Sequence, residues 1–140
     1  MSPNLGQGRG YAVFPPFIKF LLAANVAIFL VQSVFLMGLT YSGRPVEETV
    51  MTLFALWPVE SGFMPWQLLT YGFMHGSIGH LFFNCLALYQ FGSRLEYTWG
   101  GKKYLTFFLV CVVGAGLCQL AVTTYMFDPA QGPIPTLGAS

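Results

Sequence analysis

The longest apolar runs of the chain limit its fold more than any other feature of the sequence. One run covers residues 17–39, "FIKFLLAANVAIFLVQSVFLMGL", and another covers residues 104–127, "YLTFFLVCVVGAGLCQLAVTTYMF". Both are long enough to cross the hydrocarbon core of a bilayer as helices, which takes about 20 residues. The first run also exceeds the apolar region of a cleaved signal peptide, which is about 7–15 residues long. We therefore expect two retained membrane-spanning helices.

A third apolar run, "SIGHLFFNCLALYQFG" at residues 77–92, is shorter and carries polar side chains near its start. Only 8% of all residues are charged and 55% are hydrophobic, whereas soluble domains carry about 25% charged residues. We therefore interpret this run as a further span, and the chain as an all-α polytopic membrane protein with three transmembrane helices. The lipid bilayer is its first expected partner, and a net charge of +1 gives no indication of nucleic-acid binding.

The basic residues predict how these spans are oriented. Five of the six Lys and Arg residues fall on one side of the three-span arrangement, namely Arg9, Lys19, Arg94, Lys102 and Lys103. Because basic residues are enriched in cytoplasmic segments, we expect a cytoplasmic N-terminal tail at residues 1–16 and an outer loop at residues 40–76. The expected location is an integral, multi-pass position in the plasma or inner membrane.

The outer loop is long for a link between adjacent helices. It contains two apolar patches, "VMTLFALWPV" and "FMPWQLLTY". Trp57, Trp66 and Tyr71 within them are amphipathic rings of the kind that collect at the membrane–water interface. We expect a structured loop that lies partly in the bilayer. The alternative, an unstructured tether, fits this aromatic content less well.

His75, His80 and Asn84 place polar groups in a region where hydrocarbon is expected. Such groups are costly in a membrane and usually indicate a pathway or a site. Ser77 is of a residue type that caps a helix start, so His80 would be the third residue of that helix and His75 would lie in the preceding loop. Asn84 would share the face of His80, one turn or about 5.4 Å deeper.

Ser140 follows a segment rich in proline and glycine, "DPAQGPIPTLGAS", that we place outside the membrane after the span at residues 104–127. If a fourth helix begins there, Ser140 lies at about the depth of His80 and Asn84. Backbone N–H groups at a helix start can stabilise developing negative charge. The convergence of these residues at one depth favours a common site.

Two other interpretations of the polar residues remain open. A metal site would need His75, His80 and Cys85, because catalytic zinc takes three protein ligands, but the usual pair of histidines four residues apart is missing. A structural bundle would use the same polar groups only as hydrogen bonds between helices. Other side chains expected to have that interhelical role are Asn25, Gln32 and Gln119. We expect no metal and no cofactor.

Three motifs of the chain are similar to motifs of one known family. "WQLLTYGFMHGSIGHLFFN" resembles the H-x-x-x-x-H-x-x-x-N signature of the rhomboid intramembrane serine proteases. "GSRLEYTWG" resembles their G-x-x-x-E-x-x-x-G turn, and "LGAS" resembles the start of their G-A-S-G active-site motif. The matching residues are His75, His80 and Asn84 in the first motif, Gly92, Glu96 and Gly100 in the second, and Ser140 in the third. The resemblance runs from about Trp66 to the last residue.

This resemblance implies a rhomboid-like helical bundle in residues 17–140, with the start of a fourth helix at Ser140. It also implies hydrolysis of peptide bonds in transmembrane or juxtamembrane segments of membrane-protein substrates, with Ser140 as the nucleophile. His80 and Asn84 would stabilise the oxyanion, and His75 would support them by polarising or hydrating the site.

The general-base histidine of the family lies in its last span, and residues 1–140 contain no counterpart of that span. We therefore expect the 140-residue chain to be incomplete and inactive alone. The alternative function is that of a rhomboid-like pseudoprotease, which binds membrane clients without cleaving them. Gln67 stands where many rhomboids have the arginine of a Trp-Arg pair, so a salt bridge in the outer loop is not carried over. The sequence gives no indication of the oligomeric state.

Overall fold

Two long apolar helices form the frame of the molecule. The computed structural model describes residues 14–35, 38–125 and 132–138. Helix α1 covers Pro16–Leu30 and continues into a π-helical turn, η1, at Val31–Phe35, while α6 covers Gly101–Tyr125. The stretches Pro16–Ser33 and Gly101–Tyr125 are long and apolar enough to cross a membrane. The expectation of a long helix in each of these two runs is therefore confirmed.

The third apolar run lies on a helical path made of three pieces. Helix α4 covers Ile78–Ala87, the π turn η4 covers Leu88–Gly92, and α5 covers Ser93–Trp99. The path thus continues for the 7 residues of α5 beyond the predicted end of the span at residue 92. It stops where Gly100 takes a positive φ of 81°, which L-residues with side chains rarely adopt. The count of three spans stays a prediction.

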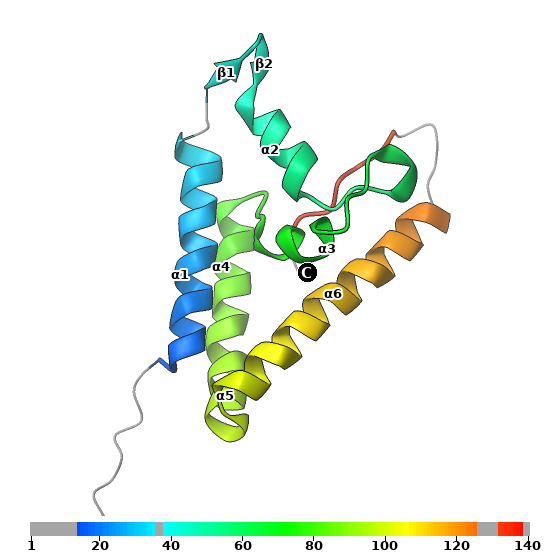
Figure 1. The fold of residues 1–140 in the computed structure, drawn as a ribbon. Coiled ribbons are helices and arrows are strands. Elements are labelled where there is room, and N and C mark those ends of the chain that lie inside the picture. Colours follow the sequence, from blue (N-terminus) through cyan, green and yellow to red (C-terminus); the bar gives the residue numbers. More distant parts are fainter. Residues whose placement is uncertain (1–13, 36–37, 126–131, 139–140) are drawn as a thin grey trace, which may run out of the picture.

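The outer loop is folded, as predicted, and is not an unstructured tether. Its elements are a small antiparallel hairpin and four short helices: β1 (Thr40–Tyr41), β2 (Arg44–Pro45), α2 (Val46–Phe54), η2 (Val59–Ser61), α3 (Gln67–Thr70) and η3 (Tyr71–Phe73). In Figure 1 the hairpin and α2 lie at one end of the molecule, α3 lies between α4 and α6, and the turn between α5 and α6 lies at the other end. The depth of this loop in a bilayer stays a prediction.

Gln67 holds the outer loop together without a salt bridge. Its side chain is fully buried, with 0% of its surface exposed. Its Oε1 accepts hydrogen bonds from the backbone N–H groups of Trp57 at 3.3 Å and Met64 at 3.2 Å. Its Nε2 donates to the carbonyl oxygen of Thr52 at 3.0 Å. A neutral amide carries both a donor and an acceptor, so it can satisfy backbone groups of both kinds in one buried place.

Glu96 links α5 to the start of α1 at the opposite end of the molecule. Its side chain is 4% exposed, and its two carboxylate oxygens accept hydrogen bonds from the backbone N–H groups of Phe17 at 3.0 Å and Ile18 at 2.9 Å. The first N–H groups of a helix have no partner within the helix, and α1 has no side-chain cap of its own at Pro15. Glu96 therefore caps α1 from α5, which gives the acidic position of the second motif a structural reason.

Helix packing is tightest where glycines let neighbours approach. A Cβ atom on Gly92 would lie 2.5 Å from side-chain atoms of both Ile18 and Tyr104, so α1 and α6 meet the helical path at this point. A Cβ atom on Gly116 would lie 3.0 Å from the ring of Tyr71 and 3.1 Å from Leu68. Gly116 in the middle of α6 thus allows close approach of α3 and η3 from the outer loop, whereas Gly114 faces open space.

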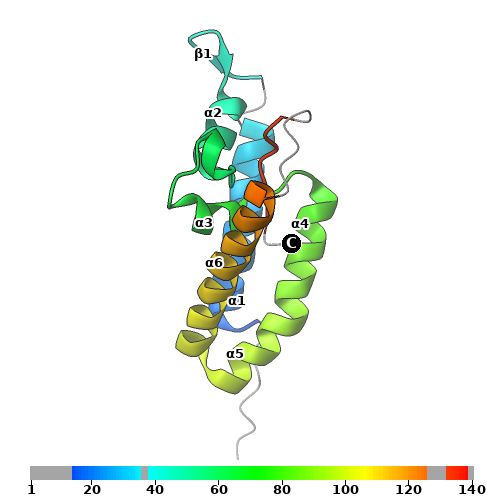
Figure 2. The ribbon, with the colours of Figure 1, turned by 90° about the vertical axis from the view of Figure 1, so that its right-hand side faces the viewer.

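Figures 1 and 2 show that α1 and α4 run side by side, while α6 leans away from them. The short helix α3 packs against α6 between the diverging helices, and the Tyr71 hydroxyl donates to the carbonyl oxygen of Val112 at 2.9 Å. Residues 132–138 then return toward α4. Leu56 and Thr136 exchange backbone hydrogen bonds of 3.1 and 2.9 Å, and Gly138 N–H donates to the carbonyl oxygen of Tyr71 at 2.8 Å.

Candidate active site

The site begins at the capped N-terminus of α4. Ser77 has an extended backbone, with φ −157° and ψ 160°, and its hydroxyl oxygen accepts a hydrogen bond from the N–H of His80 at 3.2 Å. This is the N-cap arrangement in which a side chain satisfies the third N–H of the helix. The predicted cap is therefore confirmed, with His80 half-buried in the first turn and His75 in the loop before it.

His75 is buried, with 1% of its surface exposed, and both of its ring nitrogens lie close to other polar atoms. Nδ1 lies 3.0 Å from the carbonyl oxygen of Phe73. Because a carbonyl oxygen can only accept a hydrogen bond, Nδ1 must carry the proton, and Nε2 then has a free lone pair. Asn84 Nδ2 lies 3.1 Å from this Nε2 and donates to it. The local backbone thus fixes the tautomer of His75.

The tautomer in turn fixes the orientation of the Asn84 amide. The amide group of asparagine can present either its NH₂ or its oxygen in a given direction. Because Nε2 of His75 accepts, the NH₂ group must be the one that points toward it. The NH₂ group has a second N–H, which can serve another acceptor. The contact with Asn84 therefore gives the predicted supporting position of His75 a defined geometry.

Burial lowers the pKa of His75 below its ordinary value, and electrostatic repulsion from His80 acts in the same direction, whereas the hydrogen bond to Phe73 opposes both. The two imidazole rings have centroids 5.1 Å apart and are inclined at 62°. A lowered pKa favours the neutral ring near pH 7. His75 can therefore remain a hydrogen-bond acceptor for Asn84 at neutral pH.

Gly138 brings the C-terminal segment against His80 and Asn84. A Cβ atom on this glycine would lie 2.5 Å from Cε1 and Nε2 of His80 and 3.3 Å from Nδ2 of Asn84. Its φ is +73°, so both the available space and the backbone conformation favour glycine. The sequence pattern did not single out this residue, although a glycine in "LGAS" is a visible signal of a close backbone approach.

The structure thus gathers three of the four predicted site residues, His75, His80 and Asn84, around one end of α4. Ser140, the predicted nucleophile, lies outside the described residues. Gly138 is two positions before it in the chain and is in contact with the site. The distance from Ser140 to His80 or Asn84 therefore stays a prediction.

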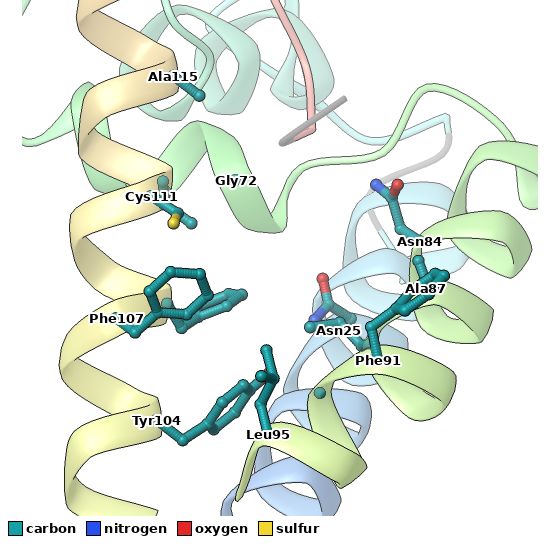
Figure 3. Close-up of a pocket in the computed structure, with 14 residues that line it drawn as sticks. Asn25, Gly72, Asn84, Ala87, Phe91, Leu95, Tyr104, Phe107, Cys111 and Ala115 are labelled. Carbon is teal, nitrogen blue, oxygen red and sulfur yellow. The ribbon is translucent and has the colours of Figure 1, made fainter. Parts of the chain in front are cut away.

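A cavity of about 360 Å³ lies beside Asn84, between the helical path α4–α5 and helix α6 (Figure 3). Aromatic and aliphatic side chains form most of its wall, and Asn25 and Asn84 contribute amides. Asn25 Nδ2 donates to the carbonyl oxygen of Leu21 at 2.7 Å, within its own helix. Its predicted interhelical hydrogen bond is therefore wrong, because the carbonyl four residues earlier serves as its partner.

Gln32, by contrast, does bond across the bundle, since its Nε2 donates to the carbonyl oxygen of His75 at 3.0 Å. For Gln119 the interhelical bond stays a prediction. Within the part of the chain that the structure describes, no group of three or more His, Cys, Asp or Glu side chains could hold a metal ion.

Comparisons with known proteins indicate the family of the chain. The family model of the rhomboid domain matches residues 62–140, the part that contains α3 to α6 and the segment with Gly138. Rhomboid-like protease 3 of Toxoplasma gondii is 34% identical over 105 residues, which is 74% of this chain and 38% of that protein. Rhomboid protease GlpG of Klebsiella pneumoniae is 27% identical over an alignment of 148 positions, which covers 97% of this chain and 50% of that protein.

Rhomboid protease GluP of Bacillus subtilis is 32% identical over 69 residues, 49% of this chain and 14% of its own length. The chain therefore spans half or less of the length of these curated relatives. The two long apolar helices and the matched domain together indicate a membrane protein. Because the rhomboid domain covers more than half of its residues, the chain belongs to the rhomboid family.

Proposed function

We propose that this protein acts as an intramembrane serine protease that cleaves transmembrane or juxtamembrane segments of other membrane proteins. Three relatives carry the word protease in their names. The observation that carries the proposal is the contact of Gly138 with both His80 and Asn84. Ser140 follows Gly138 by two residues in the chain, and we propose that it lies beside these groups, which are suited to stabilise negative charge.

In the proposed reaction, the Ser140 hydroxyl oxygen attacks the carbonyl carbon of the scissile peptide bond. The negative charge that develops on the carbonyl oxygen is stabilised by the second N–H of Asn84, by His80 and by the backbone N–H of Ser140. Donors held in place before the reaction stabilise such charge without reorganising at the moment of attack. The departing amine leaves an acyl-enzyme, and water then releases the second product.

A serine hydroxyl needs a base near neutral pH, and His75 is poorly placed to act as one. Its Nδ1 proton is directed to Phe73, and its Nε2 lone pair is already used by Asn84. His80 is assigned to the oxyanion. We therefore propose that the base is a histidine outside residues 1–140, in keeping with the share of its relatives that the chain covers.

The decisive experiment uses the protein expressed from its full gene, reconstituted in liposomes with a transmembrane substrate. Ser140→Ala should abolish cleavage. His80→Ala and Asn84→Ala should each lower kcat by about 100- to 1,000-fold, with a smaller effect on KM, because a lost oxyanion donor acts on the transition state. Cleavage that persists in Ser140→Ala would exclude the proposed nucleophile.

A client-binding pseudoprotease is the second candidate function. Both ring nitrogens of His75 are engaged, so cleavage depends on another base, and a protein that lacks such a base would bind its clients without cleaving them. The 140-residue chain should not cleave the substrate alone, and should do so only when the remaining part of its gene is supplied as a second chain. Ser140-dependent cleavage by the 140-residue chain alone would contradict the assignment of an outside base. Retention of the substrate without any cleavage, by the full protein as well, would support the pseudoprotease.

We also propose a multi-pass topology of three spans with a cytoplasmic N-terminus, residues 40–76 outside and the turn between α5 and α6 inside. Single cysteines at Ser42 and Lys103, both exposed, should be labelled from opposite sides of sealed vesicles. Ser93 is buried and is a poorer labelling position. The background variant needs its three native cysteines replaced. Labelling of both positions from the same side would contradict the topology.

A further inference from the structure

Gln32 forms a two-point contact with the backbone of a single site residue. Its side chain is 7% exposed and lies in the π turn that continues α1. Its Nε2 donates to the carbonyl oxygen of His75 at 3.0 Å, and its Oε1 accepts from the N–H of His75 at 3.5 Å. The two residues are 43 positions apart in the sequence.

The backbone of His75 has no regular secondary structure to satisfy it. Helix η3 ends at Phe73, and α4 begins only after its cap at Ser77. A buried N–H and a buried C=O without partners would each be costly. Gln32 supplies both partners, so it fixes the position and direction of this peptide unit as well as satisfying it.

The position of the His75 backbone determines which hydrogen-bond partners its imidazole ring can contact. The ring must keep Nδ1 at the carbonyl of Phe73 and Nε2 at the amide of Asn84 at the same time, with separations of 3.0 and 3.1 Å. Side-chain hydrogen bonds weaken rapidly when distance or angle departs from the favourable range. A shift of the His75 backbone therefore disturbs both contacts at once.

We propose that Gln32 is a positioning residue for the reaction: by holding both backbone groups of His75, it keeps the NH₂ group of Asn84 directed as an oxyanion donor. This inference rests on the proposed function. If His75 turns or moves away, the Asn84 amide is free to rotate by a half turn and present its oxygen instead. An oxygen at that place repels a developing oxyanion, so the loss falls on the chemical step.

The principal variant is Gln32→Met, which has a similar length and no strong hydrogen-bonding group. In the protein from the full gene, kcat should fall by about 10- to 100-fold, the size of effect that small misplacements of a catalytic group produce, with little change in KM. Gln32→Glu has a similar shape, but its ionised side chain places an acceptor oxygen against the carbonyl oxygen of His75, so it should lower kcat at least as much as Gln32→Met. Gln67→Met is the control and should keep the kcat of the wild type, because it makes the same substitution at another buried glutamine whose bonds go to backbone groups of the outer loop and not to His75.

A double-mutant cycle separates positioning from general stability. If Gln32 acts through His75, Gln32→Met should have little further effect on kcat in a His75→Ala background, because interacting residues are not additive. Full additivity of the two effects would overturn the inference. A thermal unfolding midpoint of Gln32→Met at or above that of the Gln67→Met control, which keeps its kcat, would show that the loss of kcat is not a loss of folded protein.

A second readout is independent of cleavage. The chain has two histidines, so ¹⁵N spectra of labelled imidazoles in micelles can report the tautomer of each, with His80→Asn used for assignment. The wild type should show the Nδ1–H tautomer for His75, and Gln32→Met should show a mixture of tautomers. An unchanged His75 spectrum would overturn the inference. If the wild type does not cleave, the proposed function fails, and these spectra still decide whether Gln32 positions His75.

Discussion

Replacement of Glu96 tests how the first helix is held. In Glu96→Ala the N–H groups of Phe17 and Ile18 lose both carboxylate oxygens, which lie at 3.0 and 2.9 Å. Hydrogen bonds to charged groups contribute about 1.5–3 kcal/mol each. The two bonds together give an expected decrease of about 3–6 kcal/mol in the free energy of unfolding. Water that reaches the partly buried N–H of Phe17 would move the result toward the lower end.

Glu96→Gln refines the test, because it keeps one oxygen as an acceptor and replaces the other by an NH₂ group. One of the two hydrogen bonds is lost and the other is formed by a neutral acceptor, so the free energy of unfolding of Glu96→Gln should lie between that of the wild type and that of Glu96→Ala. Glu60→Ala is the control, since Glu60 is exposed at η2 and surface substitutions usually change stability by less than about 0.5 kcal/mol.

The assay is equilibrium unfolding in mixed micelles with increasing mole fraction of a denaturing detergent, followed by tryptophan fluorescence and circular dichroism. The order of stability should be wild type and Glu60→Ala, then Glu96→Gln, then Glu96→Ala. A decrease below about 1 kcal/mol for Glu96→Ala, less than one such hydrogen bond contributes, would refute the assignment of Glu96 as the cap that anchors α1.

Three further changes have defined outcomes. Gln67→Ala leaves three backbone groups of the outer loop without partners and should lower the free energy of unfolding by at least about 1–3 kcal/mol in the same assay, whereas equal stability would contradict its role. Gly138→Ala should lower kcat, because the new Cβ atom would collide with His80. Gly132→Ala is the control, since Gly132 also has a positive φ of +71° but has open space around it, and it should keep its kcat. Equal kcat values for the two variants would contradict the contact of Gly138 with His80. The pKa of His75 is lowered in the folded state, so as the pH falls the unfolded state takes up a proton at a higher pH than the folded state does. The free energy of unfolding should therefore be highest above about pH 6.5 and decrease as the pH falls below it. Unfolding curves at several pH values should show this decrease in the wild type and not in His75→Ala.

The sequence predicts the local features of this fold well. Apolar runs show where α1 and α6 lie, because length and hydropathy alone decide whether a helix can span a bilayer. The cap at Ser77 could be predicted because it involves residues three positions apart. The shared face of His80 and Asn84 follows from their spacing of four, and both lie beside Gly138 in the structure.

Long-range features could not be predicted in the same way. The bond from Gln32 to His75 joins residues 43 positions apart, and no local pattern indicates which carbonyl a buried amide will reach. Asn25 illustrates this, since an amide on the same helix bonds to its own backbone instead. The orientation of the Asn84 amide depends on the tautomer of His75, which depends on a loop carbonyl at Phe73. Such orientation is a property of the assembled site.

The π turn at Leu88–Gly92 has a consequence for how this helical path tolerates insertions and deletions. Asn84, Leu88, Gly92 and Glu96 recur every four residues, and in a regular α-helix each such step drifts by about 40°, so that Glu96 would end about 120° away from Asn84. A π turn accommodates one additional residue, which takes back about 100°. The polar end of α4 and the cap at Glu96 thus lie on nearly the same side, and Asn84, Leu88 and Gly92 line one cavity. Loss of one residue between Leu88 and Gly92 would remove that additional residue and leave a regular α-helix, in which eleven steps of about 100° still bring Glu96 to within about 20° of Asn84. Loss of a second residue would turn Glu96 away from α1, so this segment should accept a deletion of one residue far more readily than a deletion of two.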